Sequence, residues 1–174
     1  SCPLYSEFYQ KNKMIETKRL RVIPLTPEQF ALFLNGINFM EDVLKLTPSG
    51  ETLDAHTQEA MTCQYQLDTK YPESFPLLTS WQIILKSENK AIGSACFKNL
   101  PDKEGNIEIG YGIYEAYRNQ GYMSEALEGM CQWAFTQQGI QSVIAETEEK
   151  NVASQRILQK NGMKQYKEST NSIW

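Results

Sequence analysis

The sequence predicts a single α/β domain in which helices pack on the faces of a mixed β-sheet. Three observations support this fold class. The chain has 174 residues, of which 41% are hydrophobic, enough for one compact core. Alternating apolar residues indicate short strands, and apolar residues three and four positions apart indicate helices. In the second half the order is strand, loop, helix, strand, helix, which is typical of a sheet covered by helices.

Local signals predict the first two elements. Residues 19–25 alternate between polar and apolar side chains, as in a strand with one buried face. A helix follows, because Thr26 can cap it, Pro27 suits its first turn and Gln29 completes a capping box. Gly36 ends this helix.

The middle of the chain predicts one helix and three strands. The helix spans residues 52–71, where apolar residues recur at helical spacings. The strands follow at residues 78–86, 91–98 and 106–114. The last strand alternates most clearly, with one face made by Ile107, Ile109, Tyr111 and Ile113 and the other by Glu108, Gly110, Gly112 and Tyr114.

The final third predicts two helices around one strand. A long amphipathic helix begins near residue 121 and ends at Gly139. A strand is predicted at residues 142–147, and a short helix at 151–161 that Gly162 ends. The apolar stripe of the long helix is predicted to consist of Met123, Leu127, Met130, Cys131, Ala134 and Phe135.

Composition argues against several classes of protein. The formal charge is −4 and the pI about 5.2, so no basic field favours nucleic acid as a partner. No apolar run approaches the ~20 residues of a membrane span. Residues 1–13 contain no apolar stretch typical of a signal peptide, which favours a cytoplasmic location. We interpret them as an N-terminal extension or a cloning remnant, and residues 14–174 as the domain.

Histidine and cysteine are too sparse for most metal or triad chemistry. His56 is the single histidine, and Cys2, Cys63, Cys96 and Cys131 form no C-x-x-C pair. A structural zinc site needs four clustered ligands, so no metal is expected. The thiols are interpreted as reduced and structural.

The turn at residues 118–123 carries the chemical hypothesis. It connects the strand that ends at Tyr114 to a helix, and a helix N-terminus offers unpaired N–H groups and a partial positive charge. Gly121 lets the backbone approach a ligand closely, and Arg118 adds a permanent charge. Together these features suit a pyrophosphate. The alternative is that the glycine merely allows a tight turn.

This turn resembles the phosphate loop Q/R-x-x-G-x-G/A of the GNAT superfamily of N-acetyltransferases. Arg118, Gln120, Gly121 and Tyr122 fit that pattern, whereas Met123 replaces the final Gly or Ala. Three further segments agree: Ile-Glu-Thr-Lys-Arg-Leu from Ile15, Ile-Glu-Ile-Gly-Tyr from Ile107, and the helix from Asn151-Val-Ala-Ser to Asn161-Gly-Met. The resemblance spans residues 14–174 and is closest to the branch that includes ribosomal-protein N-terminal acetyltransferases.

The resemblance implies a mostly antiparallel central sheet with one splayed strand pair, flanked by helices. It also implies acetyl-coenzyme A as the acyl donor and no metal. The pantetheine arm of the donor would run alongside Gly112 and Ile113, although glycines there also suit a bulge or thin strand. Asn151 would lie near the arm, or act only as a helix cap. The pyrophosphate would rest on the segment Arg118, Asn119, Gln120, Gly121, Tyr122, Met123 and Ser124.

The implied reaction is direct attack of a neutral amine on the thioester. A lysine-like amine of pKa ~10.4 must lose a proton at a cost of roughly 4 kcal/mol at neutral pH, whereas an α-amine of ~7.7–8.0 costs far less. A side-chain amine therefore requires a good base. Glu108 and Glu146 are the two candidates, acting directly or through water, although either glutamate also suits a solvated surface.

The departing thiolate also requires a proton or a donor. Many enzymes of the resembled family use a tyrosine on the last helix, where this chain has Leu158. Ser154 is the substitute that the sequence offers, unless it is an ordinary surface serine.

Two other functions remain open. A coenzyme A-binding sensor or scaffold without catalysis is favoured only by the absence of that tyrosine. A nucleotide-binding domain is disfavoured, because G-x-G-x-x-G and G-x-x-x-x-G-K-[ST] are absent. The acceptor is expected to be an amine on a small molecule or a peptide N-terminus, with no membrane or nucleic-acid partner, and the protein a monomer or homodimer.

Overall fold

The computed structural model describes residues 14–166, 169 and 172–174, so the interpretation of residues 1–13 lies outside the described part. A six-stranded sheet has the order β1-β2-β3-β4-β5-β6, and β7 pairs with β8 in a second, two-stranded sheet. The strands are β1 (Ile15–Glu16), β2 (Leu20–Pro24), β3 (Ser80–Leu85), β4 (Lys90–Phe97), β5 (Asn106–Ile113), β6 (Ser142–Ile144), β7 (Thr147–Glu148) and β8 (Ser172–Ile173).

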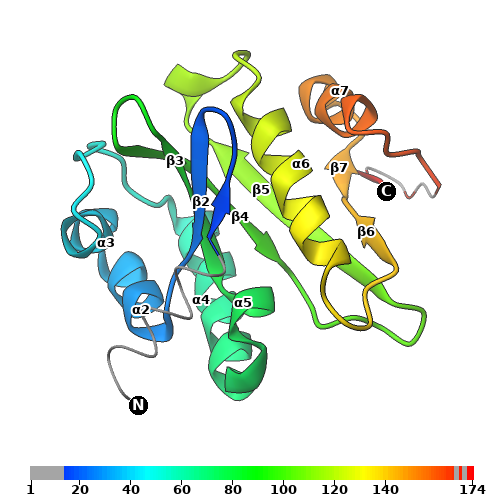
Figure 1. Cartoon of the computed structure of the whole chain (residues 1–174), viewed down its shortest axis with the longest axis horizontal. Coiled ribbons are helices and arrows are strands. Elements are labelled where there is room, and N and C mark those ends of the chain that lie inside the picture. The colour runs from blue at the N-terminus through cyan, green and yellow to red at the C-terminus, as the bar shows by residue number, and fades with distance from the viewer. Residues whose placement is uncertain (1–13, 167–168, 170–171) are drawn as a thin grey trace.

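Helices cover both faces of the large sheet (Figure 1). They are α2 (Pro27–Asn35), α3 (Ile37–Val43), α4 (Ala55–Lys70), α5 (Phe75–Leu78), α6 (Tyr122–Phe135) and α7 (Val152–Lys160), with short 3₁₀ turns η1 (Pro72–Ser74) and η2 (Glu115–Tyr117). On one face, α6 packs Met123, Ala126, Leu127 and Met130 on the sheet. On the other face, α2 and α3 form a second core around Phe30, Phe33, Ile37 and Met40.

The sheet changes from antiparallel to parallel at β5. All pairs from β1 to β5 are antiparallel, whereas β6 runs parallel to β5 and pairs only with residues 106–108. Within the described residues, no strand pairs with residues 109–113 on that edge, and β6 and β7 diverge from β5 (Figure 1). The predicted α/β class, with a mostly antiparallel sheet and one splayed pair, is confirmed.

Capping signals read from the sequence are present at the starts of α2 and α7. Thr26 Oγ1 accepts a hydrogen bond from Gln29 N at 3.2 Å, and Thr26 N donates to Gln29 Oε1 at 3.0 Å. At the start of α7, Asn151 Oδ1 accepts from Ser154 N at 3.0 Å. These short-range bonds satisfy backbone donors that a helix cannot satisfy itself.

Four predicted boundaries or faces are wrong, among them the end of the long helix, which stops at Phe135 and not at Gly139. The strand predicted at 142–147 divides into β6 and β7, because the chain leaves β5 and pairs with β8 instead. Leu78 belongs to α5 and not to a strand, since Pro76 suits the first turn of a helix. Phe135 is 54% exposed, because its position on α6 lies beside the buried stripe, which includes Ala126 instead.

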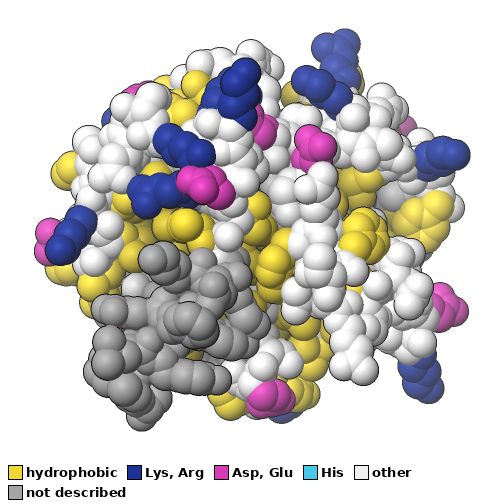
Figure 2. Space-filling model, viewed as in Figure 1, with side chains coloured by type: hydrophobic (Ala, Val, Ile, Leu, Met, Phe, Trp, Pro, Cys, Tyr) yellow, Lys and Arg dark blue, Asp and Glu magenta, His cyan; other side chains and the backbone are white. Residues whose placement is uncertain are grey.

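Charges of both signs are interspersed over the face of the molecule in Figure 2. Among the described residues, no helix is both long and apolar enough to cross a bilayer. The described residues also contain no group of three or more His, Cys, Asp or Glu side chains that could hold a metal ion.

One buried carboxyl group, that of Asp68, lacks hydrogen-bond partners among the described residues. Asp68 on α4 is 1% exposed, and neither of its carboxylate oxygens has a hydrogen-bond partner within the described structure. One turn earlier, Gln64 Nε2 is satisfied by the carbonyls of Leu78 and Phe97, each at 2.8 Å. Burial raises the pKa of Asp68 from 3.8 to about 7, because the low-dielectric interior disfavours the charged form.

We expect Asp68→Asn to stabilise the fold above neutral pH. The folded state holds the Asp68 proton more tightly than the unfolded chain, so wild-type stability falls as pH rises from about 4 to about 7. Each pKa unit is worth about 1.4 kcal/mol, so the gain at pH 8 is expected to be a few kcal/mol. Thermal unfolding at pH 4.5 and 8 measures it, with the exposed Asp42→Asn as control. An equal effect at both pH values would contradict the assignment.

Candidate active site

The predicted phosphate loop, residues 118–123, joins the carboxyl end of β5 to α6 through η2. Two of its residues have left-handed backbone, Asn119 at φ 61° and Gly121 at φ 81°. Gly121 is the residue at the N-terminus of α6, and no side chain caps that helix. The amides of the first turn of α6 therefore have no side-chain cap, and their use by an anionic ligand stays a prediction.

Side chains of the phosphate loop also hold it in shape. Arg118 Nε donates to the carbonyl of Ile113 at 3.2 Å, and Gln120 Nε2 donates to the carbonyl of Ala116 at 3.1 Å. Arg118, expected to supply charge to a phosphate, thus also connects the loop to the end of β5. The guanidinium also places a permanent positive charge beside the loop.

The first turn of α6 is fixed to α7 by an asparagine that sequence reasoning used only to end a helix. Asn161 Nδ2 donates to Ser124 Oγ at 3.2 Å and to the carbonyl of Ile157 at 3.0 Å. Ser124 was predicted to contribute its amide to the pyrophosphate site. The two helices that border the splayed edge are therefore connected at the phosphate loop.

The open edge of β5 presents backbone groups of alternate residues. Lys98 N donates to the carbonyl of Glu108, and Tyr114 N donates to the carbonyl of Ile92, each at 2.8 Å, so these positions face β4. Because successive residues direct their backbone groups to opposite edges, Ile109, Tyr111 and Ile113 face the splayed side. Those three residues offer the groups that an extended ligand arm would need.

The glycines of β5 serve different purposes. A Cβ on Gly110 would lie 2.8 Å from Lys98 Cε, so this glycine makes room for the lysine chain. A Cβ on Gly112 would have no heavy atom within 4 Å, so Gly112 lies against open space. Gly112 therefore contributes room on the strand face, whereas the carbonyl of the adjacent Ile113 accepts from Arg118 Nε.

Glu108, the first candidate base, lies where β6 leaves β5. Its side chain is 27% exposed, with Oε2 3.5 Å from Lys98 Nζ and Oε1 accepting from Trp174 Nε1 at 3.3 Å. Glu146, the second candidate, is exposed between β6 and β7. Glu108 thus lies on the strand that borders the splay, and of the two candidates it is the one whose side chain is held by neighbouring residues.

Ser154, the candidate donor on α7, is paired with a residue that the sequence analysis assigned only to a strand face. The hydroxyls of Ser154 and Tyr111 hydrogen-bond to each other across the space between α7 and β5. Burial raises the pKa of Tyr111, and the bond to Ser154 opposes this rise. Both groups are therefore protonated near neutral pH and able to donate.

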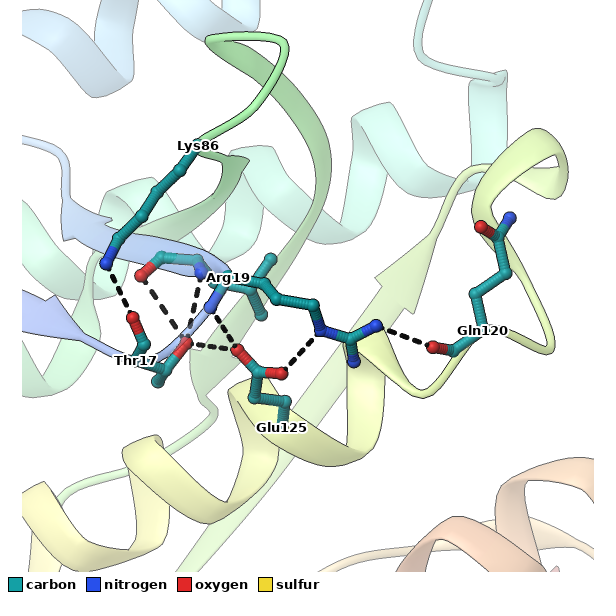
Figure 3. A network of polar contacts seen from close by, with 6 residues as sticks. Thr17, Arg19, Lys86, Gln120 and Glu125 are labelled. Carbon is teal, nitrogen blue, oxygen red and sulfur yellow. Dashed lines mark hydrogen bonds and ion pairs between the residues drawn. The ribbon is translucent and has the colours of Figure 1, made fainter.

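A network centred on Arg19 lies beside the phosphate loop (Figure 3). Arg19 Nε pairs with Glu125 Oε1 at 2.8 Å, and Arg19 Nη1 donates to the carbonyl of Gln120 at 3.0 Å. Sequence reasoning included Arg19 in the first strand and assigned it no role. The only available signal was its place in the Ile-Glu-Thr-Lys-Arg-Leu segment.

Three of the aromatic and thiol side chains that the structure describes have structural surroundings. Trp81 is fully buried and packs against Trp133, with ring centroids 4.8 Å apart, so it belongs to the core. Tyr65 packs edge-on against Phe30 at 5.4 Å. Burial raises the pKa of Cys131 to about 11, so its reactive thiolate is scarce at neutral pH.

Comparison with curated proteins finds relatives that match about half of the chain. The uncharacterized N-acetyltransferase YjdG of Bacillus subtilis is 34% identical over 83 residues, 48% of this chain and 49% of the relative. The uncharacterized N-acetyltransferase YnaD of the same organism is 32% identical over 92 residues, 53% of this chain and 50% of the relative. The matched segment spans about half the length of these curated relatives.

Solved structures show the same fold over most of the chain. The ribosomal-protein-S5-alanine acetyltransferase of Vibrio fischeri matches with a TM-score of 0.66 and 20% identity, covering 92% of this chain and 93% of that one. A ribosomal L7/L12 α-N-protein acetyltransferase in complex with coenzyme A matches with a TM-score of 0.65 and 14% identity, covering 92% and 94%. At these identities the likeness concerns the fold alone.

A family model gives the assignment directly. The acetyltransferase (GNAT) domain model matches residues 19–164, from the start of β2 to beyond α7. This span includes the phosphate loop, the splayed edge of β5 and both candidate glutamates. The chain therefore belongs to the GNAT family of acetyltransferases.

Proposed function

We propose that this protein transfers an acetyl group from acetyl-coenzyme A to a primary amine, on a small molecule or a protein N-terminus. One observation carries the proposal: the unpaired edge of β5 extends from Glu108 to the phosphate loop. Residues 109–113 extend roughly 17 Å at about 3.4 Å per residue, a path suited to an extended pantetheine arm. A ligand on this path has anion donors at one end and a carboxylate at the other.

The residues present fit coenzyme A. The left-handed Gly121 and the uncapped start of α6 suit the pyrophosphate, with the backbone of residues 119–124 as donors and Arg118 as a nearby charge. The edge amide of Ile113 and the open space over Gly112 suit the arm, while the Ile113 carbonyl already accepts from Arg118 Nε. Asn151, whose side chain caps α7, would act by placing that helix beside the arm. Bound acetyl-coenzyme A supplies the activated thioester.

Glu108 is proposed as the base that accepts the amine proton. In the transfer, a bond forms between the amine nitrogen and the acetyl carbon, and the carbon–sulfur bond breaks. The proton leaves the nitrogen for a carboxylate, directly or through one water. The contacts from Lys98 and Trp174 orient Glu108, whereas Glu146 is retained as the alternative base.

The hydroxyl pair of Ser154 and Tyr111 is proposed to protonate the departing thiolate. The two groups lie between α7 and the splayed edge of β5, and their mutual hydrogen bond lets a proton lost by one be replaced from the other, after which the pair regains a proton from solvent. Tyr111 thereby compensates for the leucine at position 158. Wild-type turnover in the Ser154→Ala variant would contradict this proposed role of Ser154.

An acetyl-coenzyme A consumption assay tests the proposed function. The acceptor panel contains free amino acids, polyamines, aminoglycosides and peptides with free N-termini. We expect thiol release above the hydrolysis background with at least one class of amine. Tight coenzyme A binding without turnover on any acceptor would favour the alternative, a non-catalytic coenzyme A-binding sensor or scaffold.

A further inference from the structure

The guanidinium of Arg19 contacts three consecutive residues of the phosphate loop and α6. It donates to the carbonyl of Gln120 at 3.0 Å, and its carbon lies 4.3 Å from the ring centroid of Tyr122. A Cβ on Gly121 would be 3.2 Å from Arg19 Nη2, so the guanidinium packs directly against the backbone of that glycine. Arg19 therefore supports the part of the loop proposed to approach the pyrophosphate.

Glu125 in the first turn of α6 holds Arg19 in this position. One of its oxygens accepts from Arg19 Nε at 2.8 Å, and the other accepts from Arg19 N at 2.9 Å and from the hydroxyl of Thr17. Burial acts to raise the pKa of Glu125, but the bonds from Thr17 and Arg19 and the arginine charge outweigh it, so the pKa is lowered. The carboxylate is ionised at neutral pH, and both of its oxygens are occupied (Figure 3).

Hydrogen bonds hold the backbone of Thr17, in the segment before β2, on both of its sides. Thr17 N donates to the carbonyl of Leu20 at 2.9 Å, and Lys86 Nζ donates to the carbonyl of Thr17 at 2.6 Å. Arg19 thus extends from a braced corner of the sheet, 106 residues away from Glu125 in the chain. A planar guanidinium suits this position, because it can bond a carboxylate and a carbonyl while stacking on a ring.

We infer that Arg19 is a positioning residue for the acyl donor. Arg19, Glu125 and Thr17 together form what we call the clamp. The clamp holds residues 120–122 in the shape that binds a diphosphate. The inference rests on the proposed function and deepens it. Binding is favoured because the loop amides are already oriented before the ligand arrives.

The test compares coenzyme A affinity across matched arginine variants. Arg19→Gln is expected to raise the calorimetric Kd for coenzyme A by about tenfold or more, because the loop loses its support. Arg19→Lys keeps the ion pair but not the fork, so partial rescue is expected. The control is Arg21→Gln, two residues further along the chain, whose guanidinium donates to Asn89 Oδ1 at 2.7 Å. Arg21→Gln is expected to leave the Kd unchanged.

Two further readouts separate positioning from simple loss of structure. At saturating acetyl-coenzyme A, kcat of Arg19→Gln is expected to stay within about twofold of wild type while KM rises, since the clamp acts on binding. The Kd effects of Arg19→Gln and Glu125→Gln are expected to be less than additive in the double variant, because they break one unit. Thermal unfolding confirms that each variant is folded at the assay temperature.

The outcomes distinguish the clamp from the proposed function. Wild-type affinity in folded Arg19→Gln overturns the clamp, even if the enzyme is active. Coenzyme A binding by wild type without turnover on any amine overturns the proposed acetyl transfer but leaves the clamp intact. A wild-type chain that does not bind coenzyme A overturns both.

Discussion

Gly121→Val is expected to abolish coenzyme A binding. Gly121 has φ 81°, a left-handed conformation that costs a residue with a Cβ about 1–2 kcal/mol, and more when that residue is β-branched. The new side chain would also start 3.2 Å from Arg19 Nη2 and displace the guanidinium that supports the loop. The backbone could then no longer approach a pyrophosphate. Calorimetric titration with coenzyme A measures the loss.

The matched control is Gly139→Val in the turn after α6. Gly139 has φ 87°, and a Cβ there would meet no heavy atom within 4 Å. It therefore suffers the same backbone strain without touching the phosphate loop. We expect both variants to lose thermal stability, and only Gly121→Val to lose coenzyme A. Unchanged affinity in Gly121→Val would refute the assignment of residues 118–123 as the phosphate site.

Glu108→Gln is expected to lower turnover by about 10²-fold or more while the Kd for coenzyme A stays at the wild-type value. The amide preserves the size of the side chain but cannot accept the amine proton, and a general base contributes about 10²–10⁴-fold. The site is far from the phosphate loop along β5, so donor binding is spared. Steady-state kcat with an acceptor from the panel, measured across pH, checks this prediction.

The size of the Glu108→Gln effect should depend on the acceptor. An amine of higher pKa costs more to deprotonate at neutral pH, so a lysine-like amine is expected to lose more rate than an α-amine. Raising the pH should partly restore the variant, since solution then supplies the neutral amine. Glu146→Gln is the comparison, and an unaltered pH–rate profile in Glu108→Gln would transfer the base role to Glu146.

Much of the architecture and part of the site follow from short stretches of sequence. The alternation that predicts β5 and the capping box of Thr26 and Gln29 concern residues within a few positions of each other. The same holds for the left-handed Gly121 between a strand and a helix. Some predictions failed because distant residues decide, as in the division of residues 142–147 between two sheets.

By itself, the sequence predicted most of the local elements, because backbone preference and capping act within one or two turns, and it offered the phosphate loop and the two glutamates as candidates. Only the tertiary structure decided what those elements bring together. The bond between Arg19 and Glu125 joins positions 106 apart, and that between Tyr111 and Ser154 joins positions 43 apart. Such contacts depend on how strands and helices pack in three dimensions, which no local pattern of residues encodes.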